Sequence, residues 1–125
     1  MKQSIDMQQR LTELEHALSR RFASPSTSVT HLADSAGRMT IQVSWVESAA
    51  DMNILDAGCA LSVVLGSRTM NRYASMSTAD RVRVRERLCS IAREKARDAR
   101  RTAPAAACNA TLDVSEPMLD EAARA

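Results

Sequence analysis

The chain has 125 residues, 45% of them hydrophobic and 2% aromatic, with a formal net charge of +2. This length predicts a single domain with an aliphatic core. Three unevenly spaced cysteines match neither a disulfide framework nor a zinc motif. The longest apolar-rich run, 59–65, is too short to span a bilayer, and residues 1–6 lack the apolar stretch of a signal peptide. We therefore expect a cytoplasmic protein with buried free thiols.

The first predicted element is a helix over residues 4–22. Its apolar residues recur every three or four positions and form one narrow stripe. Ser4 is a suitable N-cap, and Arg20 and Arg21 have the sign that favours a helix C-terminus. Packing on a sheet is the preferred use of the stripe, and a dimer seam is the alternative. The stripe consists of Met7, Leu11, Leu14, Leu18 and Phe22.

A β-hairpin is predicted next. Residues 39–45 alternate apolar and polar side chains, residues 29–33 precede them, and Asp34 and Gly37 have the positions of a type I turn. A four-residue loop would set Leu32 opposite Met39 and Thr30 opposite Ile41. His31 would then face Thr40 on the polar side of the sheet.

Two more elements and a tail follow. Residues 47–58 fit either a short helix or a loop, and 59–65 alternate as a third strand. Ser67 can cap a short helix, and Ser77 can cap a long helix over 78–101. Its predicted apolar face comprises Val84, Leu88, Ile91, Ala92, Ala96 and Ala99.

The predicted fold is a single α+β domain over residues 1–101. A small antiparallel three-stranded sheet is packed by an N-terminal helix and a long C-terminal helix, in the order αβββαα. Residues 102–125 are Ala-rich and acidic, and we expect them to be a disordered tail.

The basic side of the long helix is the candidate interaction surface. Such a face can bind phosphates, but local carboxylates also make it a normal solvated helix surface. Fifteen of the 17 basic residues are arginine, which a GC-rich coding sequence would produce by itself. The acidic tail could also lie across this face. The residues concerned are Arg83, Arg87, Arg97 and Arg101.

A second hypothesis concerns residues 61–73, which resemble the turn and recognition helix of bacterial helix-turn-helix repressors. Arg68, Asn71 and Arg72 would then read the major groove. The spacing between the Leu65-Gly66 pair and Thr69 is shorter than that pattern requires, and the β-branched pair Val63-Val64 suits a strand better. We therefore give this hypothesis little weight.

No catalytic, metal or cofactor site is expected. The cysteines Cys59, Cys89 and Cys108 and the histidines His16 and His31 show no ligand spacing and no nucleophile–base pattern. There is also no glycine-rich phosphate loop and no cluster of carboxylates suited to acid–base catalysis.

The hairpin, third strand and helical segment 68–101, with its Tyr73–Ser77 junction, resemble small bacterial proteins of GC-rich proteobacteria that are classed as domains of unknown function. This resemblance implies no activity, cofactor or residue role. Our expectation is a non-catalytic protein-interaction module that binds another protein, or a second copy through the Met7–Phe22 stripe. The alternative is a weak nucleic-acid binder that uses helix 78–101.

Overall fold

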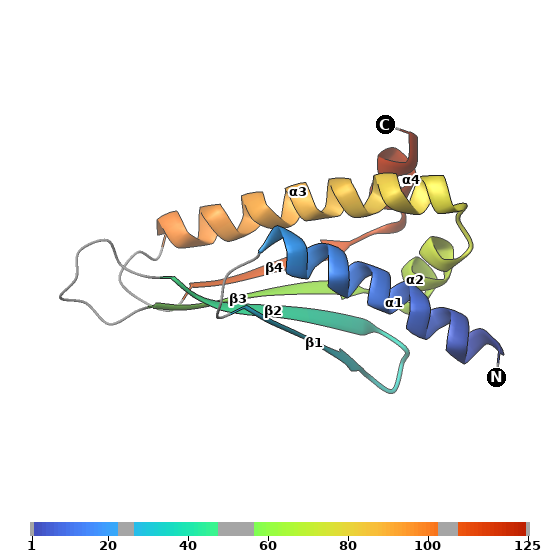
Figure 1. The fold of residues 1–125 in the computed structure, drawn as a ribbon, viewed down its shortest axis with the longest axis horizontal. Coiled ribbons are helices and arrows are strands. Elements are labelled where there is room, and N and C mark those ends of the chain that lie inside the picture. Colours follow the sequence, from blue (N-terminus) through green and yellow to red (C-terminus); the bar gives the residue numbers. More distant parts are fainter. Residues whose placement is uncertain (1, 23–26, 48–56, 103–107, 125) are drawn as a thin grey trace.

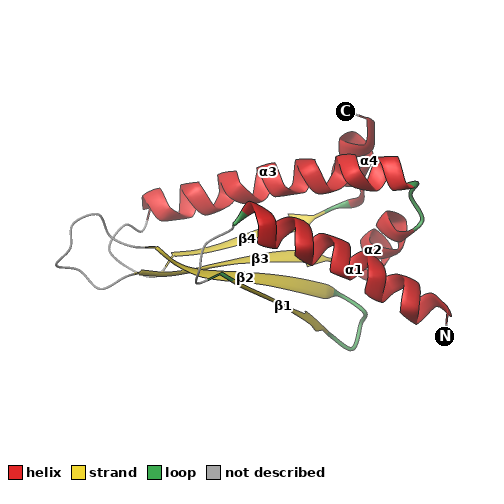
Figure 2. Ribbon diagram, viewed as in Figure 1, coloured by secondary structure: helices red, strands yellow, loops and turns green. Residues whose placement is uncertain are grey.

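The computed structural model describes residues 2–22, 27–47, 57–102 and 108–124. It is an α+β fold with a four-stranded mixed sheet in the order β1-β2-β3-β4. The helices lie on one side of this sheet (Figure 1), and no described helix covers the other side, as Figure 2 shows. The elements are α1 (Lys2–Arg21), β1 (Ser28–Ala33), β2 (Met39–Glu47), β3 (Ala57–Leu65), α2 (Ser67–Ala74), α3 (Thr78–Thr102), β4 (Cys108–Val114) and α4 (Glu116–Arg124).

The first three strands form an antiparallel meander, and β4 then pairs in parallel with β3. A parallel pair needs a long crossover connection, which α2 and α3 supply. The predicted αβββαα order is therefore incomplete, because the sheet has a fourth strand. The segment 48–56, where a short helix or a loop was predicted, lies outside the described residues.

The expectation of a disordered tail is wrong for residues 108–124. Ala110, Leu112 and Val114 alternate with polar residues along β4, and the latter two are only 3% and 5% exposed. Ser115 then begins α4, because its Oγ accepts a hydrogen bond from the Met118 N–H at 3.3 Å. The acidic composition of this segment led to the prediction of disorder, although its residues contain a strand pattern followed by a helix start signal.

The hairpin register differs from the prediction by one residue. Ala33 pairs with Met39, His31 with Ile41 and Leu32 with Thr40. The connection differs from the predicted four-residue loop, because the Asp34 N–H donates to the Arg38 carbonyl at 3.0 Å, which sets these two residues opposite each other, and Gly37 adopts a φ of 84°. Only glycine adopts this conformation readily.

The Arg38 N–H also stabilises this turn through the side chain of Asp34. It donates to Asp34 Oδ1 at 2.9 Å and holds the pKa of that carboxyl below its ordinary value. The shifted register moves His31 to the helix-facing side of the sheet, where its Nδ1 lies 3.1 Å from Glu15 Oε2 of α1. Its predicted place on the polar side is therefore wrong.

The core lies between the sheet and the helices. The α1 stripe packs there as predicted, with Leu11, Leu14 and Leu18 at most 4% exposed. A dimer seam along this stripe would require the core to open. The predicted inner face of α3 is also confirmed at Val84, Leu88, Ala92 and Ala96, which are all buried.

The capping prediction for α3 is confirmed as well. The Ser77 Oγ accepts a hydrogen bond from the Asp80 N–H at 3.2 Å, which satisfies one of the unpaired donors at the helix start. No helix of the described residues is both long and apolar enough to cross a bilayer.

The contribution of α4 to the core can be measured with Leu119→Ala. Leu119 is 0% exposed, so its truncation should lower the free energy of unfolding by about 2–5 kcal/mol. Urea denaturation measures this change, with the exposed Glu121→Ala as the control. An unchanged free energy of unfolding in Leu119→Ala would mean that the C-terminal segment does not belong to the folded domain.

Candidate interaction surfaces

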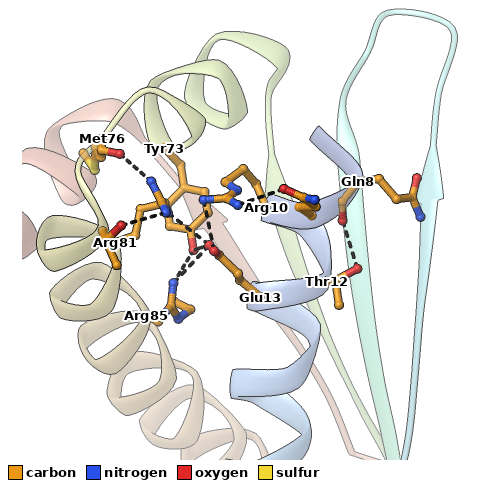
Figure 3. A network of polar contacts seen from close by, with 10 residues as sticks. Gln8, Arg10, Thr12, Glu13, Tyr73, Met76, Arg81 and Arg85 are labelled. Carbon is orange, nitrogen blue, oxygen red and sulfur yellow. Dashed lines mark hydrogen bonds and ion pairs between the residues drawn. The ribbon is translucent and has the colours of Figure 1, made fainter. Parts of the chain in front are cut away.

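A half-buried polar cluster around Glu13 joins α1 to α2 and α3 (Figure 3). Glu13 Oε1 accepts hydrogen bonds from the Tyr73 hydroxyl at 2.7 Å, Arg85 Nη1 at 3.1 Å and Arg81 Nε at 3.2 Å. Glu13 Oε2 lies 3.1 Å from Arg10 Nη1. The four charged side chains are 11–25% exposed, so these bonds are stronger than those of surface ion pairs. We call these five residues the Glu13 cluster.

The arginines of the Glu13 cluster also donate hydrogen bonds to uncharged oxygen atoms. Arg81 also donates to the Met76 carbonyl and to Thr78 Oγ1, and Arg85 Nη1 donates to the Tyr73 oxygen at 2.9 Å. Arg10 Nε is buried without a partner. One carboxylate therefore forms ion pairs with three guanidinium groups, and the junction of α1 with α3 has a net positive charge.

The predicted arginine surface is divided in the structure. Arg83 Nε donates to the Ala123 carbonyl of α4 at 2.9 Å, and its Nη2 contacts Asp80 Oδ1 at 2.7 Å. Arg83 is therefore a contact between helices and does not pair with Glu86. Arg87 and Arg97 are exposed, and neither forms an ion pair with a described residue. The side chain of Arg101 lies outside the described part of the chain.

The acidic C-terminal segment contacts a basic residue of α2, whereas no described contact joins its carboxylates to Arg83, Arg87 or Arg97 of α3. Arg72 Nε and Nη2 donate to the two carboxylate oxygens of Asp120 at 2.8 and 3.1 Å. The Asp120 hydrogen bond raises the pKa of Arg72 above its ordinary value. Because α4 occupies Arg72 and Arg83, neither residue is free to bind a phosphate.

The helix-turn-helix hypothesis for residues 61–73 is wrong. Residues 61–65 belong to β3, so the first helix of such a motif does not exist. Arg68 and Asn71 are exposed on α2, whereas Arg72 is bound to Asp120. The β-branched residues before Gly66 are typical of the strand that forms.

The described residues contain no group of three potential metal ligands. Cys89 is a buried free cysteine, as expected, but Cys59 is disulfide-bonded. The Cα partner of Cys59 across the parallel pair is Cys108. Strand pairing, and not spacing along the chain, brought these two positions together.

A cleft of about 370 Å³ opens between α1 and α3. Arg20 and Arg21 are exposed at its α1 side, and neither has an ion pair with a described residue. Burial raises the pKa of the Cys89 thiol, while the adjacent Arg21 acts to lower it. This α1–α3 cleft is lined by Ala17, Arg20, Arg21, Val82, Arg85, Glu86 and Cys89.

The face of the sheet opposite the helices is nearly free of charge. Register places its side chains in three rows of four, which we call the open sheet face. Among the twelve described residues of these rows, only Asp113, on the edge strand β4, is charged, and Leu32 on the other edge is 71% exposed. The rows are Leu32-Thr40-Val64-Asp113, Thr30-Gln42-Ser62-Thr111 and Ser28-Ser44-Ala60-Asn109.

These observations define an α+β domain with a one-sided helical layer, a charged cleft within that layer and an uncharged sheet face. The chain belongs to the family described as "Protein of unknown function (DUF3022)", whose model matches residues 11–114. This confirms the resemblance to domains of unknown function. The match ends at the last residue of β4, so it includes all four strands. No curated protein and no solved structure matches the chain.

The single tyrosine of the chain gives a direct test of the Glu13 cluster. Burial raises the pKa of Tyr73 well above its ordinary value of 10.0, because the phenolate would lose water; Arg85 opposes this shift and Glu13 adds to it. Ultraviolet titration should therefore show a protonated phenol in the folded chain at pH values where the urea-unfolded chain is already ionised.

The sign of the effect on stability follows from the same shift. The folded state favours the neutral phenol, so this contribution to stability is present below pH 10 and is lost as pH rises through the folded pKa. Coincident titration curves for the folded and unfolded chains would contradict the burial of this hydroxyl against Glu13.

Proposed function

We propose that this chain is a non-catalytic protein-interaction module, and that its docking surface is the open sheet face. The supporting observation is the lack of charge on that face in a chain of which 26% of residues are charged. Solvated sheet faces are commonly polar, but the cores of protein interfaces are depleted of charged residues. The exposed Leu32 adds an apolar contact on the same face.

The residue types of the open sheet face also argue against other ligands. Proteins that bind single-stranded nucleic acid on a sheet use aromatic side chains for stacking and cations for the backbone. The three rows contain neither. Their short side chains, such as Ser44, Ala60 and Ser62, instead allow a second sheet to approach closely.

A second copy of the chain is the partner that this charge pattern favours. Two open sheet faces bring together only one charged residue per copy, the edge-strand Asp113, whereas the arginines of α3 would repel each other. Four strands about 4.8 Å apart give a face of roughly 400 Å² per copy, which is below the roughly 800 Å² per partner of stable complexes. The proposed dimer is therefore weak and depends on concentration.

Ser62→Arg tests the proposal, because Ser62 lies in the middle row on a central strand. Sedimentation velocity of the natural chain should show a dimer that increases with concentration. The variant should stay monomeric, because dimer formation would bury two long charged side chains at the centre of a face made mostly of short uncharged ones. Ser19→Arg, on an exposed position of α1, is the matched control and should associate like the natural chain.

Two outcomes would overturn the proposal. The natural chain could remain monomeric at the highest concentration that can be measured, or Ser62→Arg could associate as strongly as Ser19→Arg. Circular dichroism of both variants confirms that each one is folded before the comparison is made.

Weak nucleic-acid binding by α3 is the second candidate. Its supporting observation is that Arg87, Arg93, Lys95 and Arg97 are exposed and that none forms an ion pair with a described residue. Glu86 and Glu94 lie among them and reduce the positive potential. A solvated helix surface has the same composition, so the binding must be tested directly.

The test is a titration with duplex DNA and with single-stranded RNA at two salt concentrations. Replacing Arg87 and Arg97 by Ala should weaken binding equally for all sequences and reduce the salt dependence by about one unit per lost phosphate contact. Arg68→Ala, on α2, is the control. If the double variant binds like the natural chain, α3 is not a nucleic-acid surface.

A further inference from the structure

We infer that the α1–α3 cleft binds a small organic anion that carries a carboxylate or phosphate group. This inference is independent of the open sheet face, since the cleft lies in the helical layer. Its volume of about 370 Å³ is within the range of small-molecule sites, which combine apolar walls with a few polar groups. Three properties of the cleft support this assignment: its charge, its apolar surface and the fixed position of its inner end.

Positive charge dominates the cleft. Arg20, Arg21 and Arg85 line it together with one carboxylate, Glu86. Arg85 belongs to the Glu13 cluster, in which three guanidinium groups share one carboxylate. The C-terminus of α1 offsets only about half a charge at Arg20 and Arg21. An anion between these arginines would therefore be attracted by the cleft as a whole.

Arginine is also suited to this role by its geometry. Its guanidinium group can donate two parallel hydrogen bonds to a carboxylate or a phosphate. Neither Arg20 nor Arg21 forms an ion pair with a described residue, so both retain donors for a ligand. Arg85 is held in place by Glu13 Oε1 at 3.1 Å and the Tyr73 oxygen at 2.9 Å. The inner end of the cleft is thus already ordered before a ligand arrives.

The other residues that line the cleft indicate which chemical groups the ligand would carry besides its oxyanion. Ala17, Val82 and Cys89 provide apolar surface, and Val82 is 39% exposed, which is unusual for a large apolar residue of this chain. A short aliphatic group of the ligand would cover Val82 while its oxyanion contacts Arg20 and Arg21. Glu86, at the same cleft, can accept a hydrogen bond from a hydroxyl or ammonium group of the ligand.

Isovalerate is the probe, because it combines a carboxylate with a short branched body. Isovaleramide has nearly the same shape without the charge, and inorganic phosphate has the charge without the body. Each is titrated at constant ionic strength against the full chain. The readouts are the arginine Nε–Hε resonances and the Val82 methyl resonances in NMR spectra.

We expect saturable shifts at Arg20, Arg21 and Val82 with isovalerate and none with isovaleramide. Arg21→Gln should weaken binding about tenfold, since it removes one charge-assisted hydrogen bond. Arg97→Gln, an exposed arginine outside the cleft, is the matched control and should leave the affinity unchanged. Tighter binding of phosphate than of isovalerate would assign the natural ligand as a phosphate ester, and the reverse order would assign it as a carboxylate.

Three results would overturn the inference: the absence of saturable shifts at Arg21 and Val82, equal binding of isovaleramide, or an equal loss of affinity in Arg97→Gln. The last result would mean that the anion binds through the overall positive charge of the chain and not at the cleft. Arg21 is exposed, so its replacement should not unfold the protein, and the dispersion of the variant's amide spectrum checks this.

Discussion

A single carboxylate, Glu13, joins three of the helices in the helical layer. It accepts hydrogen bonds from Tyr73 of α2 and from Arg81 and Arg85 of α3, which ties α1 to both following helices. Removing such a group would leave partly buried guanidinium groups without a counter-charge, and that is more costly than the loss of a surface pair. The same contacts fix Arg85, which also lines the α1–α3 cleft. The position of α1, and with it the shape of the cleft, depends on this cluster.

The helical layer also determines which face of the sheet is exposed. Because the helices cover one face, the buried apolar side chains of β2, β3 and β4 point toward them, and the alternate residues, which include Ala60 and Val64, form the open sheet face. The two candidate surfaces therefore have opposite chemistry. One is a charged cleft suited to a small anion, whereas the other has a single charged residue, Asp113, and is suited to another protein.

Local patterns predicted much of this fold. The stripe Met7–Phe22, the alternation of β2 and β3 and the Ser77 cap all follow from residues that are close in sequence. The predicted hairpin register is wrong because the turn at Gly37, which has a positive φ, sets Asp34 opposite Arg38, and a shift of one residue exchanges the two faces of a strand. The candidate surfaces could not be predicted, since they depend on pairings such as Glu13 with Arg81, which are 68 residues apart. The alternation of apolar and polar residues in 109–114, in contrast, is visible in the sequence, but the acidic composition of the segment led to the prediction of disorder.

Hydrogen exchange of the Glu13→Gln variant tests most directly whether the Glu13 cluster holds α1 in place. Glutamine keeps the size and one acceptor oxygen but removes the charge shared by Arg10, Arg81 and Arg85. We expect the amides of α1 to exchange about tenfold faster, which corresponds to about 1.4 kcal/mol, while those of β3 change little. Unchanged exchange in α1 would show that apolar packing alone positions this helix, and would contradict the central role of Glu13.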